Sequence, residues 1–169
     1  ETSGVGGALN STNSVLIVGD NAQKRQYRSI LSFNTGSLPD NAVIVSATLK
    51  LKKQGGAGAD PFGTLGNLWV DIRKPFFGAT AALQLDDFAA AAGLSNAGSM
   101  SKIPVNGLYL AKLTGAAFPQ INKLGSTQLR LRFGIDDNNN AVADYLAFYS
   151  GNIATAAFRP VLEIVYYVP

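Results

Sequence analysis

The sequence has neither cysteine nor histidine, and each absence excludes a class of site. Without cysteine, neither a disulfide nor a thiolate metal site can form; without histidine, the commonest general base and metal ligand is missing. The carboxylates of Asp71, Asp87 and Asp144 could in principle form an acid/base pair, but nothing in the sequence brings them together. We therefore expect a protein that is not an enzyme.

Charge and long apolar runs are also scarce. Charged residues make up 15% of the 169 residues, and the net charge is +3. Because the basic residues are scattered rather than grouped, the sequence argues against nucleic-acid binding. No apolar run reaches the roughly 18 residues of a membrane span, so none is predicted. The N-terminus lacks a basic segment followed by an apolar one, so we expect any signal peptide to have been removed already.

The chain does contain short segments in which apolar and polar residues alternate with a period of two. Between residues 129 and 135, aliphatic and aromatic side chains alternate with Arg130 and Arg132. This pattern predicts a strand with one buried face, from which both arginines point outward. A polar turn over residues 136–144 and a second alternating segment over 145–149 follow. We expect the two segments to pair as an antiparallel hairpin.

Similar short strands recur along the chain and predict its fold class. Residues 82–94 depart from the pattern, since acidic residues precede an alanine run that ends in glycine, as in a short helix. About nine strands with one or two short helices indicate an all-β fold, an antiparallel two-sheet β-sandwich of the jelly-roll kind. We expect it to span residues 14–169 as one module, after an extended polar segment over 1–13. The side chains predicted to share the core are Leu49, Leu51, Leu129, Leu131, Phe133, Leu162 and Ile164.

Trp69 is the only tryptophan, and it lies on the opposite face of its strand from Leu68 and Val70. An outward indole offers a flat apolar plate for a sugar ring, whose hydroxyls neighbouring polar groups can fix. The alternative is that a loop or helix covers the indole, because large aromatic side chains are well buried on average.

Several stretches together resemble a known family. They are DNAQKRQYRSILSFNTGSLPDNAVIVSATLKLKKQ, LQLDDFAAAAG, TQLRLRFGIDDNNNAVADYLAFYSG and RPVLEIVYY. The chain resembles, over nearly its whole length, the DNRLRE-type modules of secreted bacterial and archaeal proteins, also classed as carbohydrate-binding module family ninety-six. The resemblance implies a secreted or cell-surface accessory module, in several cases with affinity for acidic polysaccharides. It also implies a strand ahead of the region that contains Glu1; either this strand has been clipped from the fragment, or it comes from elsewhere, such as a neighbour.

Two functions are compatible with this sequence. The first is non-catalytic binding of an acidic polysaccharide, in which Trp69 stacks on a ring and outward basic side chains pair with uronate or sulfate groups. The alternative for these basic residues is that they only solubilise the surface. The predicted basic residues are Lys50, Lys52, Arg73, Arg130 and Arg132.

The second is a structural subunit of an extracellular fibre, pilus-like filament or matrix, assembled from identical subunits by strand complementation. The segment 1–13 is too polar and glycine-rich for a core strand, but its backbone could pair with an edge of a neighbour. Ala8 and Leu9 are the predicted donor contacts, and Val165 and Val168 the accepting edge. A frayed terminus is the competing interpretation.

The turn over residues 136–144 is a candidate calcium site. Its predicted ligands, Asp136, Asp137, Asn138 and Asp144, carry the hard oxygen atoms that Ca²⁺ prefers. The spacing lacks the glycine and the terminal glutamate of an EF-hand. The alternative is therefore a turn whose Asp and Asn side chains bond to their own backbone.

Overall fold

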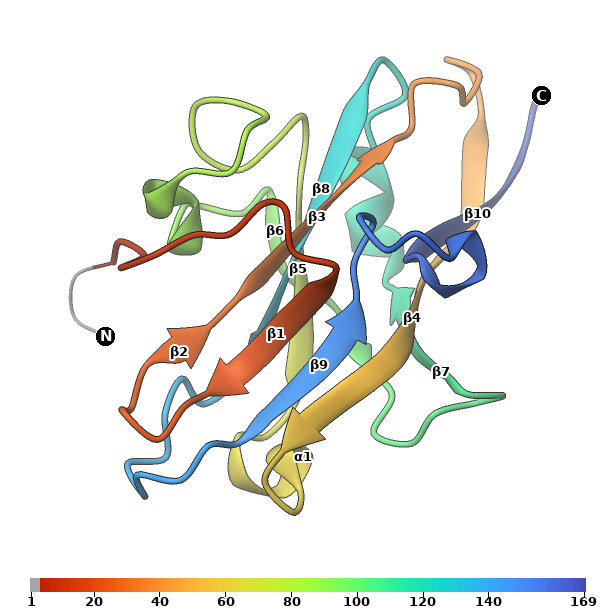
Figure 1. Ribbon diagram of the computed structural model, residues 1–169. Coiled ribbons are helices and arrows are strands. Elements are labelled where there is room, and N and C mark those ends of the chain that lie inside the picture. The colour runs from red at the N-terminus through yellow and green to blue at the C-terminus, as the bar shows by residue number, and fades with distance from the viewer. Residues whose placement is uncertain (1–3) are drawn as a thin grey trace.

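The computed structural model describes residues 4–169, and strands dominate it (Figure 1). The strands are β1 Val15–Asp20, β2 Gln26–Tyr27, β3 Ser29–Asn34, β4 Val43–Ala57, β5 Leu68–Arg73, β6 Leu94–Met100, β7 Leu108–Leu113, β8 Ser126–Phe133, β9 Tyr145–Tyr149 and β10 Val161–Tyr167. The helical segments are α1 Pro61–Thr64 and the 3₁₀ turns η1 Leu85–Phe88, η2 Gly115–Gln120 and η3 Ala156–Phe158. Between residues 4 and 169, none of these helices has the length and apolar character to cross a membrane.

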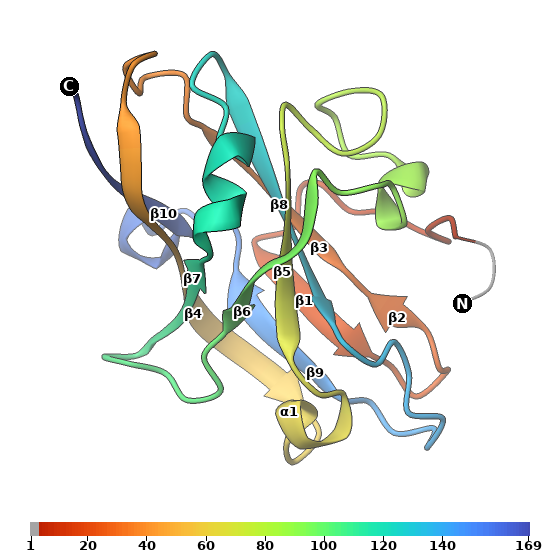
Figure 2. The ribbon, with the colours of Figure 1, turned by 180° about the vertical axis from the view of Figure 1, so that it is seen from behind.

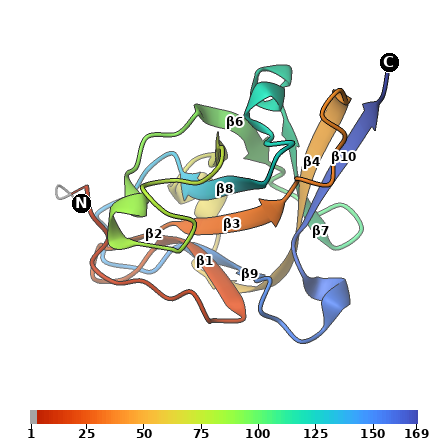
Figure 3. The same cartoon turned by 90° about the horizontal axis from the view of Figure 1, so that it is seen from above.

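All strand pairs are antiparallel and form one strongly curved sheet, in the order β2-β1-β9-β4-β7-β6-β5-β8-β3 with β10 beside β4 (Figure 3). The sheet nearly closes on itself. Arg28 alone separates β2, which pairs with β1, from β3, which pairs with β8. The Ser29 hydroxyl donates a hydrogen bond across this seam to the Ile17 carbonyl at 2.9 Å. The all-β antiparallel prediction is confirmed.

A division into two separate sheets is not confirmed, because β4 runs through both halves of the structure. One part of this 15-residue strand pairs with β9, and the rest pairs with β7 and β10. The register with β9 shifts between Lys53 and Gly55, where a bulge lets the strand bend. The result is an antiparallel sheet that is nearly closed and barrel-like.

The predicted hairpin between the segments 129–135 and 145–149 is wrong. β8 pairs with β3 and β5, whereas β9 pairs with β1 and β4. The segment between these two strands therefore crosses from one part of the sheet to another. A period of two shows which face of a strand is buried, but it contains no information on the neighbouring strand.

The core fills the inside of the curved sheet, and the predicted core residues lie there. Leu49, Leu51, Leu129 and Leu131 are fully buried and Phe133 nearly so. Leu162 and Ile164, on β10, are half-buried and pack against this core.

The helix predicted over 82–94 is only one 3₁₀ turn, η1 Leu85–Phe88, and the last residue of the predicted range, Leu94, already belongs to β6. The Asp87 carboxylate caps η1 by accepting the Gln84 backbone N–H at 2.8 Å, so this acid marks a helix start as expected.

Candidate functional site

A buried carboxylate organises the outer face of β5 and β8. Asp71 is fully buried, and its Oδ2 accepts hydrogen bonds from Arg130 Nη2 at 2.9 Å and from Arg132 Nε at 3.0 Å. The Asn96 N–H donates to Oδ1 at 3.0 Å. Burial by itself raises the pKa of Asp71, but the hydrogen bonds from Arg132, Asn96 and Arg130 outweigh it and hold the pKa below its ordinary value. Asp71 is therefore a charged anchor for both arginines.

Arg130 does not point into solvent as predicted. It is 5% exposed, because the segment 74–93, which follows β5 in Figure 2, packs against its side chain. Its guanidinium lies 4.5 Å from the centre of the Phe77 ring and donates to the carbonyls of Asp87 at 3.1 Å and Ala90 at 2.8 Å. The side chain fastens the covering segment and is removed from any ligand-binding surface.

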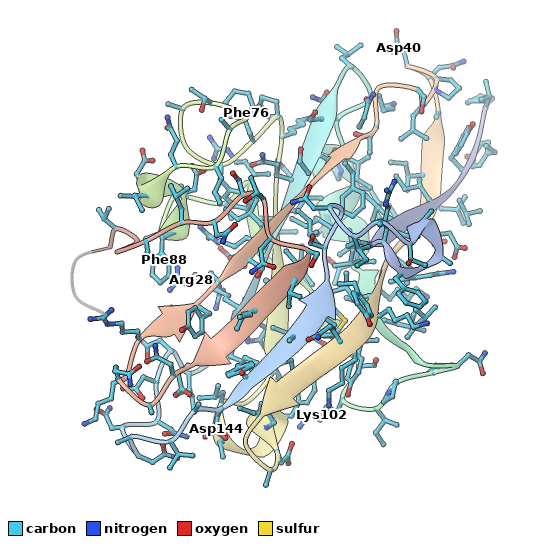
Figure 4. The ribbon with its side chains drawn as sticks, viewed as in Figure 1. Arg28, Asp40, Phe76, Phe88, Lys102 and Asp144 are labelled. Atoms are coloured by element: carbon cyan, nitrogen blue, oxygen red, sulfur yellow. The ribbon has the colours of Figure 1, made fainter. Side chains whose placement is uncertain are left out.

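Arg28, which lies between β2 and β3, also binds the segment 74–93. Its Nη1 donates to the Phe88 carbonyl at 2.6 Å, and its guanidinium lies 4.2 Å from the centre of the Phe88 ring (Figure 4). Burial lowers the pKa of Arg28 to about 10, and repulsion by Arg130 and Arg132 adds to this effect. Arg28, Arg130 and Arg132 thus lie close enough to one another and to Asp71 for their charges to interact.

Beside this buried cluster, one row of side chains on the outer face stays accessible. The strand register places Trp69 between Arg132 on β8 and Ser99 on β6, and Ser99 opposite Lys112 on β7. Lys112 in turn lies opposite Thr48 on β4. We call these five residues the Trp69 row. Because neighbouring strands are about 4.8 Å apart, Lys112 follows Trp69 at roughly 10 Å along the row.

Within the Trp69 row, the indole is partly covered by the protein and partly exposed to solvent. Trp69 is half-buried, Ser99 and Lys112 are exposed, and the Arg132 side chain is 22% exposed. A Cβ atom at Gly134 would lie 3.3 Å from the indole Nε1, so the absence of a side chain there makes room for the ring. The result is a partly open aromatic ring with Arg132 on the neighbouring strand at one side and Lys112 two strands away at the other.

The structure separates the other predicted binding residues from this row. Lys50 forms an exposed ion pair with Glu163 of β10 at 2.7 Å, and Lys52 lies over the Phe158 ring with Nζ 3.7 Å from its centre. Arg73 donates to the Ala91 carbonyl at 3.2 Å. Two strands, β7 and β6, stand between the two lysines and Trp69. Sequence reasoning missed Lys112, although its alternation with buried Ala111 and Leu113 could have placed it outward.

The acidic turn lies at the end of β1. Asp136 is exposed, Asn138 is half-buried, and Asp137 and Asp144 are buried together with Asp20, which sequence reasoning did not include. Burial raises the pKa of Asp20; two backbone hydrogen bonds oppose the rise, and repulsion by Asp137 and Asp144 adds to it.

Several Asp and Asn side chains of this turn accept hydrogen bonds from the turn's own backbone, which is the alternative to a calcium site given above. Asp137 Oδ1 accepts the Asn139 N–H at 2.9 Å, and Asn140 Oδ1 accepts the Val142 N–H at 2.7 Å. Within the described part of the chain, no group of three or more acidic side chains is already arranged to hold a metal.

The residues predicted for assembly are exposed at two separate places. Ala8 and Leu9 belong to an N-terminal stretch that lies along its own barrel, where the Gly6 N–H donates to the Leu85 carbonyl at 2.7 Å. This stretch, β1, β3 and η1 line a cavity of about 430 Å³. Val165 and Val168 are each 50% exposed at β10 and just beyond it. Residues 1–3 of the predicted donor segment lie outside the described residues.

In comparisons with known proteins, the chain matches no protein-family model and no curated protein. The resemblance to DNRLRE-type modules therefore stays a prediction.

Proposed function

We propose that this protein is a non-catalytic carbohydrate-binding module that holds an acidic polysaccharide along the Trp69 row. The observation that carries the proposal is the half-buried Trp69 between the cationic side chains of Arg132 and Lys112. An indole stacks on the C–H face of a sugar ring, and the flanking cations pair with carboxylate or sulfate groups of neighbouring sugars. The resemblance supports the same function, a jelly-roll fold, and a secreted or cell-surface location.

Arg132 suits this role because its guanidinium is fixed before a ligand arrives. Its Nε and Nη2 donate to Asp71, and Nη2 also donates to the Asn96 side chain at 2.7 Å. No hydrogen bond within residues 4–169 uses its Nη1. A cation held in one orientation loses little conformational entropy when it pairs with an anionic sugar.

Affinity electrophoresis through gels that contain polygalacturonate tests the proposal. We expect the native protein to be retarded, but not in a gel of neutral dextran. Trp69→Ala should weaken binding about tenfold, equivalent to about 1.4 kcal/mol, because it removes the stacking ring. Lys112→Ala should weaken binding less, and its effect should shrink at high salt.

Tyr167→Ala is the matched control, because it removes a 56% exposed aromatic ring from β10, away from the Trp69 row. It should leave the retardation unchanged. Equal retardation of the native protein and Trp69→Ala, or equal retardation in both gels, would rule out the proposed surface.

A second candidate, a strand-complemented fibre subunit, is favoured by the free edge of β10. Within residues 4–169, β10 pairs with β4 alone, and Val161, Val165 and Tyr167 on it are each at least half exposed. An unpaired apolar edge is a template for a strand of another subunit.

Light scattering tests this second candidate. If β10 accepts a neighbour's strand, native multimers should dissociate in Val165→Lys, since a charged edge disfavours pairing. Deletion of residues 1–9 should have the same effect if that segment is the donor. Multimers that survive both changes, or a native protein that stays monomeric at every concentration, would exclude assembly by this route.

A further inference from the structure

Three carboxylates lie buried together at the end of the barrel where Figure 4 labels Asp144. Asp20 is 0%, Asp137 7% and Asp144 3% exposed. The ion pairs found among residues 4–169 engage Asp71 and Glu163 and none of these three acids. Buried carboxylates without a basic partner are unfavourable, and proteins that keep them pair the charge or bind a metal.

Hydrogen bonds place the three acids in one small region. Asp20 Oδ1 accepts the Asp144 N–H at 2.9 Å, and Asp20 Oδ2 lies 3.4 Å from the donating Asn138 N–H. Asp144 Oδ2 accepts Asn138 Nδ2 at 2.9 Å. The side chain of Asp20, from β1, therefore reaches both ends of the acidic turn, next to Asp137.

A separate observation concerns the second oxygen of the Asp137 carboxylate. Asp137 Oδ2 is buried and accepts no hydrogen bond, although the turn supplies one to the other oxygen of the same carboxylate. One other buried carboxylate oxygen in the described chain, Asp87 Oδ1, also accepts no hydrogen bond; Arg130 donates to the backbone carbonyl of the same residue, so a guanidinium lies near it. None of the ion pairs within the described residues engages Asp137. A buried carboxylate oxygen of this kind is a position that a cation can fill.

The chemistry of the donors selects the ion. The available atoms are carboxylate and amide oxygens and backbone carbonyls; the sequence has no cysteine or histidine, and its one methionine, Met100, is buried in the core. The donors come from β1 and from an irregular turn. Such an arrangement suits the flexible coordination of Ca²⁺ better than the strict octahedron of Mg²⁺.

We propose that Asp20, Asp137 and Asp144 bind one calcium ion. The site differs from the one expected from sequence in two ways: Asp20 takes the place of exposed Asp136, and Asn138 donates a hydrogen bond to Asp144 instead of being a ligand. The three side chains do not yet form a finished cage, so the ion draws them together. Binding would fasten the connection between β8 and β9 to the end of β1, independently of the Trp69 row.

Calorimetric titration of the chelator-treated native protein with calcium chloride tests the site, together with thermal unfolding in calcium and in EDTA. We expect one bound ion and a higher melting temperature in calcium. Asp137→Asn keeps the shape of the side chain but removes its charge, so it should weaken binding about tenfold or more. Circular dichroism should show that this variant folds, because it removes an unpaired buried charge.

Asp136→Asn is the matched control, since it removes the same charge from the adjacent, exposed residue. It should bind calcium as the native protein does. The proposal is overturned if the native protein shows neither heat nor a shift in melting temperature. Equal weakening by both substitutions would indicate diffuse attraction rather than a site, and equal heats with magnesium chloride would refute the choice of calcium.

Discussion

Replacing Asp71 with asparagine should destabilise the protein severely. The buried carboxylate accepts two hydrogen bonds from each of Arg130 and Arg132, and a fifth from the Asn96 N–H. Removing one partner of a buried ion pair destabilises a protein by about 3–5 kcal/mol, because the other charge stays buried and unpaired. Since the Arg132 side chain is 22% exposed and can turn toward water, we expect a loss near the lower limit, about 3 kcal/mol.

Urea unfolding at neutral pH measures this loss by linear extrapolation. Asp86→Asn is the control, because Asp86 is an exposed acid on η1, and its substitution should change the unfolding free energy by less than about 0.5 kcal/mol. A loss below about 1 kcal/mol for Asp71→Asn, with an unchanged denaturant slope, would refute the reasoning that this carboxylate holds both arginines.

The same carboxylate makes the stability depend on pH. Burial raises the pKa of Asp71, but the hydrogen bonds from Arg132, Asn96 and Arg130 bring it below the ordinary value. The unfolded chain therefore binds the proton more readily, and the contribution of Asp71 is complete above an ordinary aspartate pKa of about 3.9. It is lost as the pH falls through the lower folded-state pKa. The stability difference between the native protein and Asp71→Asn should narrow in acid.

Two further substitutions test local features. Gly58→Ala should lower the unfolding free energy by more than about 1 kcal/mol, because φ is +80° there and a Cβ would overlap Asp144 Oδ1. The same urea assay should show a smaller loss for Gly55→Ala, whose Cβ would meet no atom within 4 Å; equal losses would contradict the steric argument. Lys50→Ala breaks the exposed pair with Glu163 and should lower stability by about 1 kcal/mol at most, and less at high salt. A larger loss that salt leaves unchanged would contradict this view of the pair.

The buried faces of the strands could be predicted from the sequence because a strand alternates its side chains locally. Leu129 and Leu131 lie in the core for this reason. The neighbours of each strand could not be predicted in the same way. Residues 134–144 join strands that pair with different partners, and only the packing of the whole sheet decides those partners.

The candidate sites, too, depend on contacts between distant residues, which local sequence patterns do not predict. Alternation placed Arg130 on the face opposite to the core, but it could not reveal that the segment 74–93 covers that face. Asp20 meets Asp144 across 124 positions of sequence, so no local pattern connects the two residues. The position of Trp69 on the outer face could be predicted, whereas its alignment with Lys112 depends on the register of three strands.

Fluorescence titration tests the central claim most directly, because Trp69 is the only tryptophan and every change in indole emission reports on the proposed surface. Adding oligogalacturonate should change the emission in a saturable manner, and Lys112→Ala or high salt should weaken the apparent affinity. A neutral oligosaccharide should have no effect. An emission that stays constant while the native protein is retarded by polygalacturonate would show that the polysaccharide binds elsewhere and would contradict the account.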